Sequence, residues 1–252
     1  MPPRRARVVF LTSGEALPDV GPALRRLGVG VLRLAVLRPT AREPSRWLSG
    51  TPRPPRVDVV LATSRHAVLL GLLPWSRLPP GPVRGVSFWA SGPGTAKLLR
   101  EHGFGPVRRG PGVGAAGILA GLAGTPQRIL YLRSDLAGPG LARQLRRQGH
   151  HVTERVVYDT RTDPGLVRRN HGLLRRADLL VVTSPSAFLA LRRGLGATEL
   201  RGLREAVPVV VLGSLSASAA RSAGFRRVVV VPPTTPQRFA RRLVRELADG
   251  RP

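Results

Sequence analysis

Short apolar runs alternate with helical patterns rich in alanine, leucine and arginine along almost the whole chain. Some runs are continuously apolar, such as Val228 to Val231, which is typical of parallel strands covered on both faces. The pattern predicts strands over 7–12, 31–37, 57–62, 86–90, 127–132, 152–158, 178–182, 208–212 and 227–231. It predicts helices over 18–27, 66–73, 94–102, 114–123, 139–148, 165–176, 185–194, 215–222 and 235–247. This alternation predicts an α/β protein with parallel sheets flanked by helices.

The pattern occurs twice. Residues 7–104 and 128–225 carry the same motifs in the same order, offset by 120–121 positions. For example, the run DVVLATS at 58–64 returns as DLLVVTS at 178–184. Motifs that recur in one order at one offset indicate two similar lobes. We expect the functional site in a cleft between these lobes.

Two segments, 31–38 and 152–159, occupy the same place in each copy, and each leads into a polar stretch that contains proline. If each copy's first strand joins the later elements of the other copy, both segments cross between lobes. They run in opposite directions and can pair as a two-stranded β linker. One Rossmann- or flavodoxin-like lobe then contains residues 1–38 plus 161–252, and the other contains 39–158. Two contiguous halves, 1–125 and 126–252, are the alternative.

The composition limits the classes of protein. With 42% hydrophobic residues the chain has enough apolar surface for real cores. The absence of cysteine excludes disulfides, thiolate metal sites and cysteine nucleophiles. The best apolar stretch, 57–73, is interrupted by Arg65 and His66 and is shorter than the ~20 residues of a membrane span. The N-terminal segment has no cleavage motif, so we interpret the protein as cytoplasmic.

The charge balance is extreme, with 41 basic against 14 acidic residues and a formal net charge of +27. Nearly all the basic residues are arginine, which a high-GC genome explains without any functional cause. The functional explanation is a polyanionic partner, either nucleic acid or a polycarboxylate. Nucleic-acid binders interleave basic residues with stacking aromatics. Aromatic residues make up only 4% of this chain, which disfavours nucleic acid.

Small polar turns follow five of the predicted strands. Ligands bind at the carboxyl ends of strands in open α/β sheets, and a helix that begins there offers N–H groups that favour an anion. Serine and threonine also cap helices without any ligand, so each turn has two interpretations. The candidate binding residues in these turns are Thr12, Ser13, Ser64, Arg65, Ser91, Gly92, Ser184, Ser186, Gly213, Ser214 and Ser216.

Common catalytic motifs are absent. Position 97 is lysine, so the turn at 92–94 does not continue into a dinucleotide fingerprint, and no P-loop or metalloprotease motif occurs. The five histidines have no metal-ligand spacing, so we expect no metal site. The remaining candidate is Tyr158, whose counterpart in the first copy is Leu37. Its hydroxyl is specific to one crossing segment, although a tyrosine in a strand often serves only packing.

With these motifs in this order, nearly the whole chain resembles the uroporphyrinogen-III synthase family. The motifs are the turn TSPSA at 183–187, the glycine-bounded helix at 213–224, the arginine-bearing strand at 131–133, and the segment from Gly149 to Tyr158. The resemblance implies two α/β lobes joined by a two-stranded ladder. It also implies the reaction: the linear tetrapyrrole hydroxymethylbilane closes to uroporphyrinogen III, with ring D inverted and water lost. This reaction belongs to tetrapyrrole and heme biosynthesis and uses no cofactor.

The resemblance assigns roles to particular residues. The family's tyrosine falls on Tyr158, which implies that its hydroxyl assists departure of the substrate's hydroxyl group. The family's binding positions fall on Ser64, Ser184, Ser186, Ser214 and Ser216. Their hydroxyls and the neighbouring N–H groups suit a polycarboxylate substrate.

One departure from the family pattern concerns the turn after the first strand. Family members often have Thr-Arg-Pro there, whereas this chain has Thr12-Ser13-Gly14. The carboxylate-binding arginine expected in this turn is therefore missing, and Arg65 and Arg133 are the candidates to replace it. The rival interpretations are a catalytically silent two-lobed domain that binds an anionic ligand and a nucleic-acid-binding protein. We expect a monomer that contacts no membrane.

Overall fold

The computed structural model describes residues 6–13, 17–48, 50–51, 56–77, 85–112 and 114–249. The chain forms two compact units, one of Met1–Arg38 with Arg161–Pro252 and one of Pro39–Thr160. The first and last parts of the chain therefore belong to one unit. Gly14, in the first predicted turn, lies outside the described residues.

The unit formed by both ends of the chain contains a five-stranded sheet in the order β11-β10-β9-β1-β2. All four strand pairs are parallel. The strands are β1 (Arg7–Leu11), β2 (Gly30–Leu34), β9 (Leu179–Val182), β10 (Val209–Val211) and β11 (Val228–Val230). The helices are α1 (Val20–Arg26), α8 (Pro164–Arg169), α9 (His171–Arg175), α10 (Ala187–Gly194), α11 (Ala197–Ala206), α12 (Ser214–Ser222) and α13 (Pro236–Ala248).

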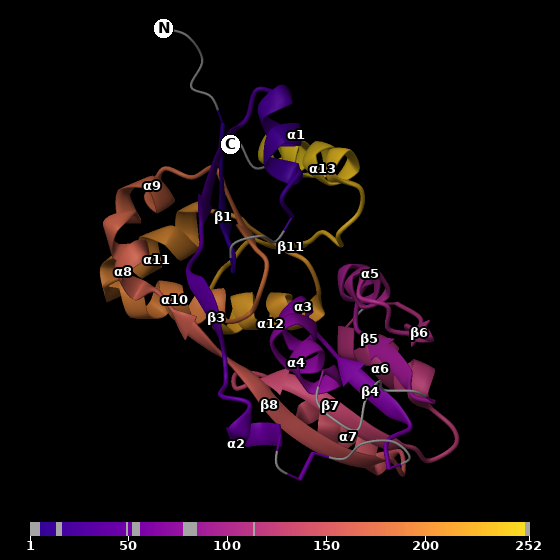
Figure 1. Cartoon of the computed structure of the whole chain (residues 1–252). Coiled ribbons are helices and arrows are strands. Elements are labelled where there is room, and N and C mark those ends of the chain that lie inside the picture. The colour runs from indigo at the N-terminus through magenta and orange to yellow at the C-terminus, as the bar shows by residue number, and fades with distance from the viewer. Residues whose placement is uncertain are drawn as a thin grey trace, which may run out of the picture. The chain divides into compact units, whose positions relative to one another are not determined.

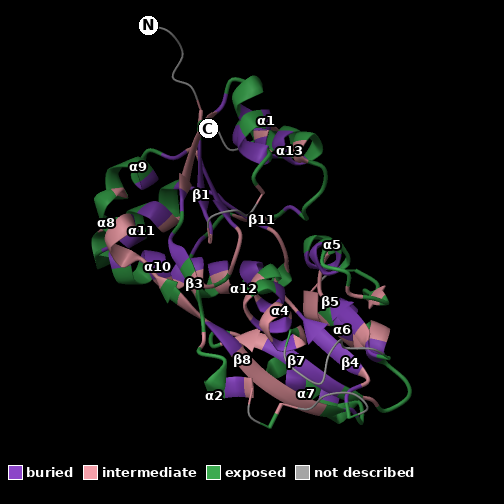
Figure 2. Ribbon diagram, viewed as in Figure 1, coloured by how far each residue is buried: buried purple, intermediate pink, exposed green. Residues whose placement is uncertain are grey.

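Helices cover both faces of this sheet (Figure 1). Alternate residues of β1 point to opposite faces, so Val9 and Leu11 join one apolar cluster while Val8 and Phe10 join the other. Helices α8 to α12 complete the first cluster, and α1 and α13 complete the second. In Figure 2 the central strands are buried and the helices expose their outer faces. This explains why the strands are continuously apolar in sequence.

The unit of residues 39–160 contains most of a six-stranded sheet in the order β3-β8-β7-β4-β5-β6. Its strands are β3 (Leu37–Ala41), β4 (Val59–Ala62), β5 (Ser87–Ala90), β6 (Val107–Arg108), β7 (Arg128–Ser134) and β8 (His151–Thr162). Its helices are α2 (Ser45–Leu48), α3 (Arg65–Ala67), the π-helix η1 (Val68–Leu72), α4 (Leu73–Ser76), α5 (Pro93–Glu101), α6 (Gly114–Leu122) and α7 (Gly140–Arg147). Helices α2 to α5 pack on one face, and α6 and α7 pack on the other.

Strands β3 and β8 are neighbours in the sheet. The boundary between the two units falls within both strands, after Arg38 in β3 and after Thr160 in β8. The N–H of Asp163 donates to the carbonyl of Val36, and the N–H of Arg42 donates to the carbonyl of Val157. Residue numbers rise along β3 while those of the paired residues on β8 fall, so the two strands are antiparallel. The pairing strand is β3, which begins at Leu37, whereas residues 30–34 form the separate strand β2 of the other sheet.

The predicted α/β class with parallel sheets is confirmed, but several predicted bounds are wrong. The predicted strand 31–37 is two strands, because the chain leaves the side of β1 after Leu34 and turns to β8. The predicted helix 165–176 is two helices, because Asn170 departs from helical geometry with a ψ of 15°. Strand β8 extends to Thr162, beyond the predicted 158, and the helix α11 was not predicted.

Candidate functional site

A bulge in the sheet decides which way Tyr158 points. Strands β7 and β8 pair in one register as far as Arg133 and Val156. The next pair joins Ser134 to Tyr158, which leaves Val157 as an extra residue on β8. A bulge interrupts the alternation of side chains along a strand. Val157 and Tyr158 are therefore consecutive and yet buried in the same cluster, on the face that α3 and η1 cover.

The phenol of Tyr158 is enclosed by polar and aromatic neighbours. Its hydroxyl lies 2.9 Å from Oγ of Ser64, and the ring of His66 lies with its centroid 5.7 Å from that of the phenol. Only 7% of Tyr158 is exposed. Burial raises the pKa of the phenol, and hydrogen bonds with the Ser64 and Ser134 hydroxyls offset part of that rise. Tyr158 is therefore neutral at physiological pH and keeps a proton that it can donate.

The helix after β4 places Ser64 beside Tyr158. Ser64 accepts a hydrogen bond from the N–H of Ala67 at 3.0 Å and so caps α3. The helix continues through the π-helix η1, whose Gly71 packs directly against Val157. A Cβ at position 71 would lie 2.5 Å from Cγ2 of Val157. Because glycine permits this approach, the helix lies close to β8 and its first residues meet the phenol.

Two further predicted residues, Ser91 and Gly92, lie in the next turn of the same sheet edge. The hydroxyl of Ser91 donates to the carbonyl of Thr63 at 2.8 Å, which ties the turns after β4 and β5 together. Gly92 is the N-cap of α5 and has no side chain to cap the helix. The first N–H groups of α5 have no acceptor within the helix and remain as donors for an anion.

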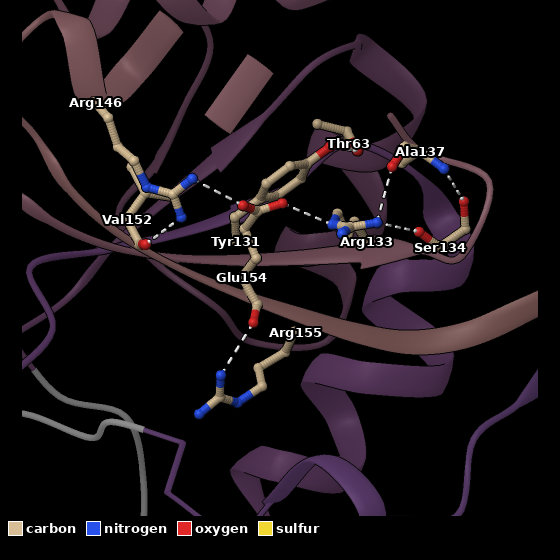
Figure 3. A network of polar contacts seen from close by, with 9 residues as sticks. All are labelled: Thr63, Tyr131, Arg133, Ser134, Ala137, Arg146, Val152, Glu154 and Arg155. Atoms are coloured by element: carbon tan, nitrogen blue, oxygen red, sulfur yellow. Dashed lines mark hydrogen bonds and ion pairs between the residues drawn. The ribbon is translucent and has the colours of Figure 1, made fainter. Parts of the chain in front are cut away.

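The two arginines considered for the missing carboxylate-binding role have different surroundings. Arg133 is 18% exposed in its side chain, and its guanidinium binds Glu154 and two backbone carbonyls, as Figure 3 shows. Arg65 is exposed at the start of α3, and its side chain has no hydrogen bond or ion pair with another described residue. The geometry therefore leaves Arg65, rather than Arg133, as the candidate for binding a carboxylate.

In the other unit, the turns after β1 and β9 lie side by side because these strands pair up to Leu11 and Val182. Thr12 is 1% exposed, and its backbone binds Leu34 and Leu37, so it sets the course of the turn. The next residue, Ser13, is only half-buried. Of these two predicted residues, Ser13 is the better placed to reach a ligand.

The remaining predicted residues belong to the turns before α10 and α12. Ser184 and Ser186 are half-buried, Ser214 is exposed, and Ser216 is buried. Neither helix has a side-chain hydrogen bond at its N-cap, which is Ser186 in α10 and Gly213 in α12. Ordinary capping therefore accounts for Ser64 but not for Ser186 or Gly213.

Three residues near these turns were not singled out from the sequence. Ser134 is the last residue of β7 and Asp135 follows it. The N–H of Asp135 donates to the carbonyl of Tyr158 at 3.1 Å. The internal repeat contained a signal for Ser134, since it occupies in the second copy the place of Ser13 in the first. Leu215 is 65% exposed between Ser214 and Ser216, a property that no sequence pattern reveals.

The fold is shared with solved structures of known function. A mutant uroporphyrinogen III synthase from the thermophilic bacterium Thermus thermophilus is 20% identical, with a TM-score of 0.67 over 97% of this chain and 99% of that chain. The uroporphyrinogen-III synthetase from Helicobacter pylori is 18% identical, with a TM-score of 0.59 over 96% of this chain and 99% of that chain. These similarities place the chain in the class of two-unit α/β proteins that includes both enzymes.

The family follows from the sequence comparison. The family model for uroporphyrinogen-III synthase HemD matches residues 19–240. The chain belongs to the uroporphyrinogen-III synthase family, a family of enzymes in tetrapyrrole biosynthesis. No curated protein matches the chain. Within the described ranges, no helix combines the length and apolar character needed to cross a membrane.

Proposed function

We propose that this chain closes hydroxymethylbilane to uroporphyrinogen III, with inversion of ring D and loss of water. Membership of the family over residues 19–240 supports the reaction. The observation that carries the proposal for this chain is the phenol of Tyr158, buried and hydrogen-bonded to Ser64 at the carboxyl end of the sheet. A neutral phenol in this position suits the departure of a hydroxyl group.

With inversion of ring D, the chemistry requires one C–O bond and one C–C bond to break and two C–C bonds to form. The pyrrole nitrogen of the first ring supplies the electron pair that expels the hydroxyl of the substrate's hydroxymethyl group. Tyr158 donates a hydrogen bond or proton to that oxygen, which leaves as water. Ring D then attacks the exposed methylene carbon through its substituted α-carbon. The older bond from that α-carbon to the methylene of ring C breaks, this methylene joins the unsubstituted α-carbon of ring D, and that carbon loses its proton. The raised pKa of Tyr158 makes its phenolate a strong base that regains the proton readily.

We infer that hydroxyls and backbone N–H groups in the strand-end turns bind carboxylates of the substrate. In one unit these are Thr12, Ser13, Ser184, Ser186, Gly213, Ser214 and Ser216, and in the other Ser64, Arg65, Ser91 and Gly92. Uncapped helix N-termini and hydroxyls bind carboxylates without requiring many arginines. Because the substrate also closes unaided to the wrong isomer, the enzyme's main contribution is to hold the geometry for ring D attack.

The test is the isomer ratio of the product. Hydroxymethylbilane generated enzymatically is incubated with and without the protein, and the uroporphyrinogens are oxidised and separated. We expect mainly the III isomer with the protein and the I isomer without it. An unchanged excess of the I isomer at equimolar protein would overturn the proposal.

A further inference from the structure

The guanidinium of Arg133, at the end of β7, is engaged on several sides (Figure 3). Its Nε lies 2.8 Å from Oε2 of Glu154, whose Oε1 lies 3.0 Å from Nη1 of Arg146. Its Nη1 donates to the carbonyls of Ser134 at 3.0 Å and Ala137 at 2.8 Å. The side chains of Arg133 and Glu154 are only 18% and 17% exposed. Solvent therefore screens this pair less than an exposed ion pair.

The turn 134–137, whose carbonyls Arg133 binds, also forms hydrogen bonds with the segment around Tyr158. The N–H of Asp135 donates to the carbonyl of Tyr158 at 3.1 Å, and Oδ1 of Asp135 accepts from the N–H of Thr160 at 2.9 Å. The hydroxyl of Ser134 hydrogen-bonds the phenol itself. The chain of contacts thus runs from the guanidinium through two carbonyls to the backbone and hydroxyl of Tyr158.

We propose that Arg133 is a positioning residue that fixes the turn 134–137 next to Tyr158, and that it does not bind the substrate. Nε and Nη1 are engaged by Glu154 and the two carbonyls, so to bind a carboxylate through two nitrogens Arg133 would have to give up one of these contacts. Lysine cannot replace it, because only the planar fork of arginine reaches a carboxylate and two carbonyls together. The link to turnover rests on the proposed function, whereas the link to Tyr158 does not.

The test uses Arg133→Lys, which keeps the charge and removes the fork. The chain has two tyrosines, so in a Tyr131→Phe background the ultraviolet absorbance of tyrosinate reports Tyr158 alone. We expect the pKa of Tyr158 to fall, because burial is the largest cause of its rise and a loosened turn admits water. In the same protein we expect kcat to fall about tenfold while KM stays within about twofold, since only the placement of the phenol changes.

The matched control is Arg128→Lys at the opposite end of the same strand. Arg128 also binds a carboxylate through two nitrogens, at 3.0 and 2.6 Å from the oxygens of Asp58. It contacts no part of the turn, so the pKa of Tyr158 and kcat should both stay at the wild-type values. Should Arg133→Lys fail to fold, Glu154→Gln loosens the same guanidinium and should shift both readouts in the same direction.

Two results would overturn the proposal. A raised KM at unchanged kcat would make Arg133 a substrate ligand. An unchanged pKa of Tyr158 in Arg133→Lys and in Glu154→Gln would show that the turn does not depend on Arg133. The titration needs no substrate, so it decides the positioning role even if the protein does not form uroporphyrinogen III. Failure of the isomer assay with wild-type protein would count against the proposed function alone.

Discussion

For single residues, the direction of one side chain depends on the backbone around it. If the side chains of β8 alternated regularly through Val157, Tyr158 would point to the sheet face covered by α6 and α7, away from Ser64. The bulge therefore creates the contact of 2.9 Å between two hydroxyls that are 94 positions apart in the sequence. Burial then keeps the phenol protonated, so the same local geometry sets both its place and its chemical state.

Replacing Tyr158 by phenylalanine tests the role of the hydroxyl. The ring and its packing remain, so folding should be intact, while turnover should fall by about 10²-fold, the low end for a general acid. The product should remain mainly the III isomer, because confinement rather than the phenol selects it. The measurements are kcat and the isomer ratio.

The control for this substitution is Tyr131→Phe. Tyr131 is also buried in a neighbouring strand, but its hydroxyl lies 3.4 Å from Oγ1 of Thr63 and belongs to the other face of the sheet. It should retain wild-type turnover. Full activity in a folded Tyr158→Phe variant would remove Tyr158 from the mechanism and leave it a packing role.

At the scale of elements, close contact between the helix 65–76 and β8 holds the site together. Gly71→Ala should destabilise the protein by about 1–3 kcal/mol, because the added methyl group overlaps Val157 in a packed core. Gly140→Ala is the control in the same unit, since nothing lies within 4 Å of a Cβ there. Urea unfolding followed by tryptophan fluorescence measures both. Equal stability of the two variants would contradict the close packing.

The opposite end of the same sheet contains a carboxylate with a strongly shifted pKa. Side-chain and backbone hydrogen bonds from Arg128 lower the pKa of Asp58 to about 2. A lowered carboxyl pKa stabilises the fold above the ordinary value, and this stability is lost as pH falls toward the folded-state value. Between about pH 5 and pH 2, wild type should lose about 1 kcal/mol more than Asp58→Asn, a figure reduced for solvent screening.

Urea unfolding at several pH values, followed by fluorescence, measures this difference. Arg128→Gln removes the same pair from the other side, so it should resemble Asp58→Asn in its weaker dependence on acid. Parallel losses in wild type and Asp58→Asn would show that the pair contributes nothing.

For the whole molecule, the two units differ in their spectroscopic probes. The three tryptophans, Trp47, Trp75 and Trp89, all lie in the unit of residues 39–160. Intrinsic fluorescence therefore reports that unit, whereas far-ultraviolet circular dichroism reports both. Because each unit has its own apolar clusters, we expect the two unfolding curves not to coincide. Coincident curves from both probes would show that the units unfold as one.

Much of the candidate site could be predicted from the sequence because its residues lie in local motifs. Ser64, Ser91, Ser186 and Gly213 were singled out as turn residues after apolar strands, and each lies between a strand and the helix that follows it. The repeat indicated the parallel α/β class because each copy has the same order of strand and helix patterns. Periodicity and turn chemistry are properties of neighbouring residues, so a single sequence determines them.

What only the tertiary structure decided depends on residues far apart in the chain. The register shift at Val157, the approach of Gly71 and the engagement of Arg133 each involve partners on other strands or helices. No pattern of neighbours encodes such contacts, because packing and pairing choose among registers that the local sequence permits equally. The sequence by itself therefore determined the elements and the type of chemistry. The tertiary structure decided which hydroxyls lie in contact and which partners engage Arg133.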